Sequence, residues 1–271
     1  MKPGRIRLRG LALMLGFVAA AGPGASSGGW TLRLDFEDGA PGREARGRDA
    51  FDDAVGRSVY SAERRAAGKQ AARLAIREGS EGWDEWGGRK FFPHPISRGG
   101  EVWLRVRVYW PPGFDWSADP WLKFLRVHTR SPGADEEARY DDWYLNEGST
   151  TGMHRFISDA QDLGRDCGGT SHDPRHGVWE SYQMYLRFDS VAASAGGAGL
   201  VRLWKGSDLL CEIRDMRTLR SADSFADAFL FGTYWNGAAP ATQHMFLDDV
   251  VITTRVPSGR DGHGNPMIPS P

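Results

Sequence analysis

The sequence predicts an all-β protein, an antiparallel β-sandwich of jelly-roll type, and three observations lead to this prediction. Short segments of alternating apolar and polar residues recur along the chain, and turn-forming residues separate many of them. No long segment has the periodicity of an amphipathic helix, and the strands lack the spacing of βαβ units. The 35 glycines suit many tight turns. We therefore expect two packed sheets built from many short strands.

The predicted strands follow one another at short intervals. The first is 30–37, which ends at Asp38-Gly39, and a polar, arginine-rich loop extends from there to about residue 69. The other strands are predicted at 71–77, 101–110, 121–129, 142–146, 180–189, 200–204, 209–214, 228–235 and 244–254. Pro111-Pro112-Gly113 is one of the turns that separate them.

The two ends of the chain are predicted to lie outside this sandwich. Residues 1–27 combine a basic head, an apolar run too short for a normal membrane anchor, and small residues, which is the pattern of a secretory signal peptide. Cleavage after Ala21 and cleavage after Ser27 both fit, and an uncleaved anchor is the alternative. Residues 28–256 suffice for one sandwich domain, and the Gly- and Pro-rich residues 257–271 are predicted to be a disordered tail. We expect a secreted or periplasmic monomer with no membrane attachment after signal cleavage.

Composition limits the partners and cofactors. The formal net charge of −1 argues against a generally basic nucleic-acid-binding protein, although it allows a local basic groove. Cys167 and Cys211 fit either a disulfide or a free thiol buried at Cys211. Glu37, Asp248 and Asp249 lie on strands expected to meet, where they fit a structural Ca²⁺ site or ordinary turn hydrogen bonds. No cofactor is required for the chemistry considered below.

Two segments carry the candidate reactive residues. Alternation along 122–128 puts Arg126 and His128 on one face of a strand, and alternation along 229–236 does the same for Gly232, Tyr234 and Asn236. If the two strands are neighbours, a cation, an imidazole and a phenol converge. These groups suit removal of a proton next to a sugar carboxylate. A hydrogen-bonded strand histidine and an ordinary sheet aromatic are the alternatives.

Arginines and aromatic residues also occupy the polar sides of strands 101–110 and 180–189. Aromatic rings stack on sugar rings, and guanidinium groups form forked hydrogen bonds with carboxylates, so we expect one open, concave, basic binding face. A solvated outer face is the alternative. The substrate-binding candidates are Arg89, Lys90, Arg105, Arg107, Tyr109, Lys123, Asn146, Gln183, Tyr185, Arg187 and Asn236.

Three motifs resemble those of a known group. Arg126-Val127-His128 stands where alginate lyases carry Gln-Ile/Val-His, and 231–236 keeps the glycine and tyrosine of their Tyr-Phe-Lys-Ala-Gly-x-Tyr-Asn-Gln strand. Residues 246–251 look like the last strand of heparin-lyase-like proteins. The order of strands over most of the chain resembles polysaccharide lyases with a concanavalin A-like jelly roll. Arg126 replaces the glutamine of the motif, the lysine of the second motif is absent, and the Arg-x-Glu-x-Arg strand has Arg89-Lys90 as its nearest counterpart.

The resemblance implies β-elimination on an anionic polysaccharide that contains uronic acid. His128 would be the general base, Tyr234 the proton donor to the leaving oxygen, and Arg126 the group that neutralises the substrate carboxylate. A non-catalytic carbohydrate-binding protein is the leading alternative. A glycoside hydrolase would need two facing carboxyl groups, but the adjacent Asp84 and Glu85 would point to opposite faces of a strand. Asp141-Asp142 fits a solvated loop, and a role in shaping the rim of the groove is the alternative.

Overall fold

The computed structural model describes residues 28–54, 58–82, 87–117, 121–132, 138–160, 163–189, 197–235 and 237–270. Within these ranges, no helix has both the length and the apolar character needed to cross a membrane. The predicted signal peptide at 1–27 and the acidic pair Asp84 and Glu85 lie outside the described residues. The leader and export of the protein therefore stay predictions.

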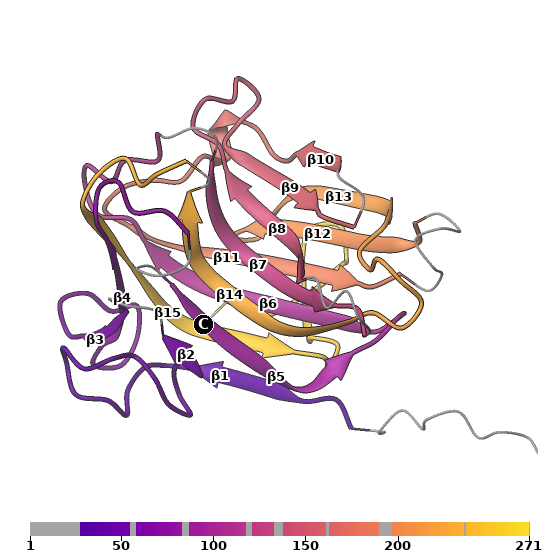
Figure 1. Cartoon of the computed structure of the whole chain (residues 1–271), viewed down its shortest axis with the longest axis horizontal. Coiled ribbons are helices and arrows are strands. Elements are labelled where there is room, and N and C mark those ends of the chain that lie inside the picture. Colours follow the sequence, from indigo (N-terminus) through magenta and orange to yellow (C-terminus); the bar gives the residue numbers. More distant parts are fainter. Residues whose placement is uncertain are drawn as a thin grey trace, which may run out of the picture.

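The described chain forms two antiparallel sheets that pack face to face (Figure 1). The eight-stranded sheet has the order β13 (Asp208–Met216), β12 (Gly199–Lys205), β11 (Trp179–Arg187), β6 (Glu101–Tyr109), β15 (Gln243–Thr253), β4 (Ala71–Ile76) and β3 (Val59–Ser61), and β1 (Thr31–Leu34) also pairs with β15. The seven-stranded sheet has the order β10 (Leu163–Asp166), β9 (His154–Ser158), β8 (Arg139–Leu145), β7 (Leu122–Arg130), β14 (Phe225–Trp235), β5 (Gly88–Ile96) and β2 (Asp53–Ala54). We call them the β6/β11 sheet and the β7/β14 sheet. The predicted antiparallel sandwich is confirmed.

The core lies between the two sheets and is rich in aromatic side chains. The fully buried ones include Trp110, Phe124, Trp143, Tyr182 and Trp235. Burial of one large apolar side chain contributes about 1.5–3 kcal/mol, so this layer is the main source of stability. Strand alternation then directs the intervening residues outward, away from the core.

Strands β2, β3, β5, β9 and β10 were not among the predicted strands, and β2 and β3 lie in the stretch that was predicted as a loop. Strand β5 contains Pro93 and Pro95, and proline rarely occurs inside a strand. The structure accommodates both prolines in an irregularity of the sheet. Phe91 pairs with Ala228 and Ile96 pairs with Ala226, so the residues from 92 to 95 lie between two points of regular pairing. A bulge of this kind tolerates residues that cannot donate to the hydrogen-bond ladder.

A disulfide joins Cys167 to Cys211, with their Cα atoms 5.1 Å apart. The sequence left open whether these cysteines form a disulfide or Cys211 is a free thiol, and the structure contains the disulfide. The bond ties the loop after β10 to strand β13, and the amide of Gly168 donates to the carbonyl of Leu210 at the same place (2.9 Å). The short 3₁₀ turn Thr170–His172 follows in this loop.

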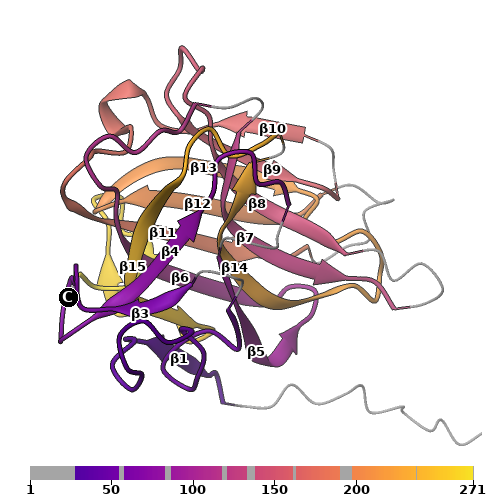
Figure 2. The same ribbon diagram turned by 60° about the vertical axis from the view of Figure 1, so that its left-hand side comes forward.

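The prediction of a disordered C-terminal tail is wrong for the described residues up to 270. This segment forms the two-stranded ribbon β16 (Gly259–Arg260) and β17 (Pro266–Met267), and Figure 2 shows it on the side of β15 that faces away from β14. Ile268 is buried with Trp204, and the Trp204 indole donates to Asp261 at 2.8 Å. The glycines and prolines shape turns here, while the apolar side chains supply the contacts that keep the segment in place.

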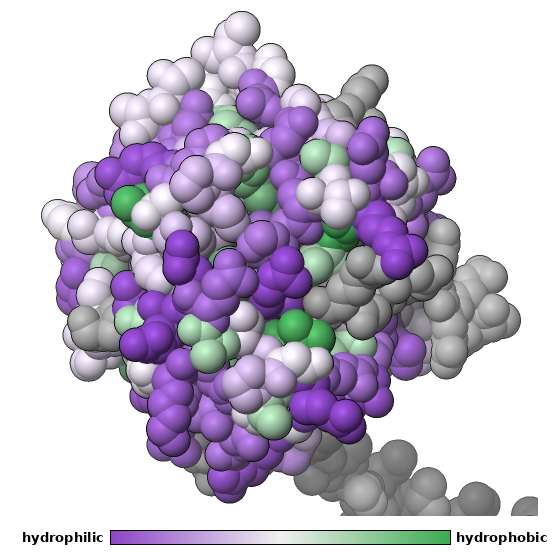
Figure 3. Space-filling model, turned by 90° about the vertical axis from the view of Figure 1, so that its left-hand side faces the viewer, coloured by the Kyte–Doolittle hydropathy of each residue, from purple (hydrophilic) through white to green (hydrophobic). Residues whose placement is uncertain are grey.

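The face of the molecule in Figure 3 is mostly hydrophilic, and its apolar residues form small separated spots. Among the described residues, the large apolar side chains that are exposed are Phe91, Val178 and Val256. Phe91 is 44% exposed and lies on the outer face of the β7/β14 sheet. This exposed aromatic ring makes the outer face of the β7/β14 sheet a candidate binding surface.

Candidate functional site

Strands β7 and β14 are antiparallel neighbours, as the sequence analysis predicted. His128 pairs with Ala228, and Arg126 pairs with Leu230. Val127 and Phe229 alternate with these residues and are buried in the core, so Arg126 and His128 point outward. We call this outer surface, defined by Arg126, His128, Tyr140 and Asp142, the His128 face.

The imidazole of His128 is held by a carboxylate. Its Nδ1 lies 2.5 Å from Asp227 Oδ1, and the other oxygen of Asp227 lies 3.4 Å from Nε of Arg130. A carboxylate at Nδ1 favours the tautomer in which Nδ1 carries the proton and Nε2 keeps its lone pair. Within the described part of the chain, no hydrogen bond is made to Nε2. The arrangement is that of an oriented general base.

Arg126 has its own carboxylate partner. Its Nε and Nη2 donate to the two oxygens of Asp142 at 2.6 and 3.1 Å, and both residues are almost fully buried. The ring of Tyr140 covers the guanidinium at 3.6 Å and lies 5.3 Å from the His128 ring. Because Asp142 already compensates the charge, this pairing argues against Arg126 as the group that neutralises a substrate carboxylate. Its geometry instead positions Tyr140 beside His128.

The charge of Asp142 affects the acids and phenols around it. Burial and Asp142 both raise the pKa of Tyr144, and the same two causes, in that order, raise the pKa of Asp159. Asp159 also accepts a hydrogen bond from the amide of Tyr140 at 3.1 Å. Burial raises the pKa of Asp141, which faces the core, well above its usual range. The expectation of a solvated loop at Asp141-Asp142 is wrong, since both lie in β8 and are fully buried.

Tyr234 belongs to β14, but its Cα pairs with Lys123 rather than with His128. His128 lies five positions beyond Lys123 on β7, which corresponds to roughly 16 Å along a strand. The side chain of Tyr234 and all of Asn236 lie outside the described residues. The roles of His128 and Tyr234 stay predictions, and Tyr140 is the tyrosine whose ring contacts His128.

The prediction of one shared binding face is wrong. Arg105, Gln183 and Tyr185 lie on the β6/β11 sheet, whereas Arg126 and His128 lie on the β7/β14 sheet. The outward side of β6 and β11 is covered by the C-terminal segment: Gln183 exchanges two hydrogen bonds with the backbone of Ile268, at 2.9 and 3.0 Å. We call this the tail-covered face. Alternation identified outward-facing residues correctly, but it does not reveal which sheet a strand joins.

The remaining candidates divide between the two sheets. Arg105 pairs with Asp249 at 2.7 Å, and Arg107 donates to the carbonyl of Ala66 at 3.3 Å. Lys90 is turned inward and donates to Asp52 (2.8 Å) and to backbone carbonyls. Arg89 and Lys123 belong to the β7/β14 sheet, Tyr109 and Arg187 to the β6/β11 sheet, and Asn146 forms the turn after β8, where its side chain accepts the amide of Gly148.

The oxygens proposed for Ca²⁺ have protein partners. Glu37 accepts the amides of Lys69 and Gln70, and Asp248 accepts those of Ala66 and Ala67, with distances from 2.7 to 3.2 Å. Burial raises the pKa of Asp248 to about 6. Among the described residues, no group of three or more His, Cys, Asp or Glu side chains is arranged to hold a metal ion. The calcium site stays a prediction.

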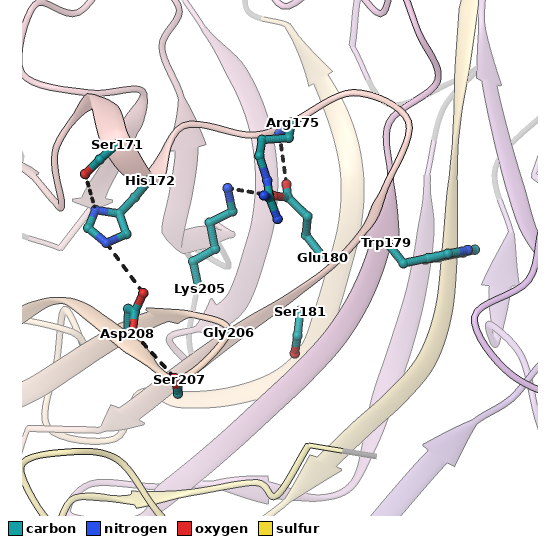
Figure 4. Close-up of a pocket in the computed structure, with 10 residues that line it drawn as sticks. All are labelled: Ser171, His172, Arg175, Trp179, Glu180, Ser181, Lys205, Gly206, Ser207 and Asp208. Carbon is teal, nitrogen blue, oxygen red and sulfur yellow. Dashed lines mark hydrogen bonds and ion pairs between the residues drawn. The ribbon is translucent and has the colours of Figure 1, made fainter.

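A pocket of about 410 Å³ lies between the loop before β11 and the β12–β13 turn (Figure 4). Its central acid, Glu180, is saturated by Lys205 at 2.8 Å, by the Arg175 side chain at 2.9 Å and by the Tyr182 hydroxyl at 2.7 Å. These donors lower the pKa of Glu180 although burial opposes them. The arrangement is that of a buried structural ion pair.

The fold has counterparts among solved structures. An endo-β-1,4-glucuronan lyase from the fungus Trichoderma reesei superposes with a TM-score of 0.58 at 11% identity, covering 83% of this chain and 95% of that one. The alginate lyase Aly36B gives 0.57 at 14% identity, with 82% and 96% covered. The alginate lyase vAL-1 from Chlorella virus gives 0.51 at 13% identity, with 74% and 90% covered.

At these identities the likeness establishes a shared fold: the structural neighbours of this chain are polysaccharide lyases with a sheet-rich fold. No family model matches the sequence, and no curated protein matches it either. The assignment of residues therefore depends on the geometry of this chain alone.

Two residues of the site were missed by the sequence analysis. Asp227 lies one residue before the predicted start of strand 228–235, and Tyr140 lies two residues before the predicted start of strand 142–146. Both strands begin three residues earlier than predicted. A longer strand would have placed Tyr140 and Asp142 on one face, but the partner of His128 depends on a register shift between Ala226 and Ala228 that no pattern signals.

Proposed function

We propose that this protein is an exported lyase that cleaves a uronic-acid-containing anionic polysaccharide by β-elimination at the His128 face. The observation that supports this most strongly is the His128–Asp227 pair on an outward sheet face. The shared fold with proteins named as alginate and glucuronan lyases adds support at the level of architecture. His128 Nε2 is oriented as a base, and an exposed aromatic ring, Phe91, lies across Ala228 from it.

In the proposed reaction, Nε2 of His128 takes the proton from the ring carbon that bears the carboxylate. The electrons of that C–H bond form a carbon–carbon double bond, and the glycosidic C–O bond breaks. The leaving oxygen receives a proton from the phenol of Tyr140, the tyrosine next to His128. Arg130 is the cation assigned to the substrate carboxylate: its side chain is 52% exposed, and its 3.4 Å pair with Asp227 compensates its charge less closely than the 2.6 Å pair with Asp142 compensates that of buried Arg126.

The test is a panel of alginate, glucuronan and heparin incubated with the purified protein. A lyase raises both the ultraviolet absorbance of the unsaturated uronate and the number of reducing ends. A hydrolase raises reducing ends alone, and a binding protein retains polymer without releasing either product. The proposal fails if polymer is bound and no unsaturated product forms under any tested condition.

Tyr140→Phe and Tyr234→Phe separate the two candidate proton donors. We expect the larger loss of kcat in Tyr140→Phe, because its ring contacts both His128 and Arg126. A larger loss in Tyr234→Phe would move the donor to the position that the motif resemblance indicates.

A further inference from the structure

The loop between β3 and β4, residues 62–69, carries charge that the proposed reaction does not use, and we call it the basic loop. Both strands lie at the left of Figure 1, on the side that Figure 3 shows to be mostly hydrophilic. The acid of this loop, Glu63, lies 3.7 Å from Nε of Arg73 on β4. The loop also exposes three cations, Arg64, Arg65 and Lys69. A protein of formal net charge −1 therefore concentrates positive charge at this point.

The three cations are open to a binding partner. Among the described residues, the side chains of Arg65 and Lys69 make no hydrogen bond or ion pair. Arg64 donates to the carbonyl of Glu63 at 3.0 Å, and its guanidinium carbon lies 5.6 Å from the ring centre of Tyr109. An anion can therefore reach these charges without displacing a carboxylate of the protein.

Two carboxylates hold the backbone of the basic loop. Asp248 accepts two loop amides, at 2.7 and 3.0 Å, and Glu37 accepts the amide of Lys69 at 2.7 Å. Gly68 has a φ of +58°, and a Cβ at this position would collide with the Glu37 carboxylate. Because the backbone is already fixed to the sheet, a ligand has to order only the basic side chains.

Two aromatic residues of the β6/β11 sheet lie next to the basic loop. Tyr109 and Trp179 are paired across β6 and β11, and their ring centres are 5.7 Å apart. Both side chains point outward, because their chain neighbours Val108 and Glu180 are buried. Trp179 is half-buried, and in Figure 4 its indole points away from Glu180 and Lys205. An aromatic ring beside cations suits a sugar ring that carries a carboxylate.

The C-terminal segment packs against a different part of the same sheet. It hydrogen-bonds to Arg105 and Gln183, whereas Tyr109 and Trp179 lie four positions from these residues on their strands. Among the described residues, no hydrogen bond joins 257–270 to Tyr109 or Trp179. This surface is therefore distinct from the part that the tail occupies, and it lies on the opposite sheet from the His128 face.

We propose that the basic loop and Trp179 form a second, non-catalytic binding site for an acidic polysaccharide. Carboxylates of the chain lie against Arg64, Arg65 and Lys69, and one sugar ring lies against Trp179. Charge complementarity supports a polyanion, and the net charge of −1 argues against a nucleic-acid-binding protein. Only the choice of a polyuronate rests on the proposed function.

The test follows the amide NMR shifts of Arg65 and Gly68 while hexasaccharides of alginate and of glucuronan are added in turn to His128→Ala protein. This background lacks the proposed base, and the two amides report on the basic loop alone. We expect saturable shifts with at least one of the two sugars. Affinity should be about two- to thirtyfold lower when Arg65→Gln and Lys69→Gln are combined, because exposed ion pairs are individually weak. Absence of a shift with either sugar overturns the proposal.

A matched control removes the same charge elsewhere. Arg77→Gln combined with Arg165→Gln changes two exposed arginines outside the site, and affinity should equal that of the parent protein. Equal losses of affinity in the two double variants overturn the proposal, because they indicate an effect of total charge. Equal binding of maltohexaose, which is neutral, overturns the assignment of an acidic sugar.

Trp179→Ala separates recognition of a sugar from attraction of charge. We expect about tenfold weaker binding in protein shown by circular dichroism to be folded, since tryptophan often dominates a binding surface. Unchanged affinity overturns the sugar contact, and if this variant does not fold, the double variant of exposed residues decides. Tighter binding of phosphatidylglycerol vesicles or of oligothymidylate overturns the choice of a polysaccharide. Loop shifts in a protein that never forms an unsaturated product leave this inference standing, while the proposed function fails.

Discussion

The outer face of the β7/β14 sheet and the outer face of the β6/β11 sheet both carry arginines beside aromatic residues. On the first, His128 is oriented by Asp227, and the exposed ring of Phe91 lies on the same surface. On the second, the segment from 257 to 270 packs over Trp103 and Tyr185 and hydrogen-bonds to Gln183. The same pattern of residues thus serves as a candidate reaction surface on one sheet and as an attachment surface for the chain's own C-terminus on the other.

The contacts that a sheet face makes with the rest of the chain, rather than the residue types on it, therefore determine whether the face can bind a ligand. Arg105 of the tail-covered face is paired with Asp249, and Arg126 of the His128 face is paired with Asp142. Each arginine therefore has a structural role, because a neighbouring aspartate compensates its charge. What separates the faces is a histidine that is 7% exposed, is held at Nδ1 by Asp227 and has no hydrogen bond to its second ring nitrogen among the described residues.

The largest expected effect comes from replacing the base. His128→Ala should reduce kcat on the polymer that the protein cleaves by about 10²- to 10⁴-fold, since positioned proton transfer contributes that much. Arg107→Ala, the matched change on the other sheet, should leave kcat close to that of the wild type. Steady-state kinetics on folded, circular-dichroism-matched variants measure both. Comparable losses in the two variants would remove the distinction between the faces.

Deletion of 257–271 should act on stability rather than on chemistry. The deletion exposes Trp204 and removes the buried Ile268, and loss of one buried isoleucine side chain costs about 2–5 kcal/mol. We expect a lower free energy of unfolding in urea, with the turnover of the remaining folded protein unchanged at low temperature. A shortened chain that is as stable as the full one would show that the tail does not hold this face.

Asp227→Asn should affect catalysis through the orientation of His128. The amide keeps the shape of the side chain but loses the charge that favours the Nδ1–H tautomer, so kcat should fall roughly 10- to 100-fold. KM should change little, because Asp227 does not bind substrate in this account. The pH profile of kcat should also shift, whereas a merely structural role would leave that profile in place.

The smallest expected effect concerns the tail at acid pH. Hydrogen bonds from Trp204 and Asn265 lower the pKa of Asp261 to about 2, although burial opposes them. A lowered folded-state pKa stabilises the fold above the unfolded value of 3.8, and this contribution is lost as pH falls from about 4 to about 2. Asp261→Asn should flatten the pH dependence of stability in that window. Unfolding curves collected between pH 2 and pH 5 provide the measurement, and an identical slope in wild type and variant would contradict this role.

Much of the fold was predictable because apolar alternation determines which side of a strand is buried. Leu104 and Val127 face the core as their patterns predict, and β7 pairs with β14. The assignment of strands to sheets was not predictable, since the pairing of Gln183 with Arg105 depends on contacts between distant segments. The C-terminal segment was wrongly predicted to be disordered because its glycine and proline content indicates only how the backbone turns. The order comes from specific contacts of Ile268 and Asp261 with Trp204, which composition does not reveal.

Hydrogen–deuterium exchange with a bound uronate oligosaccharide tests the central claim most directly. His128→Ala, which should retain binding without turnover, is compared with and without the oligosaccharide of the polymer that the wild type cleaves. If the sugar binds at the His128 face, exchange should slow in peptides from β7, β8 and β14. Slowed exchange confined to β6, β11 and residues 257–270 would contradict it, because the sugar would then occupy the face that the tail covers.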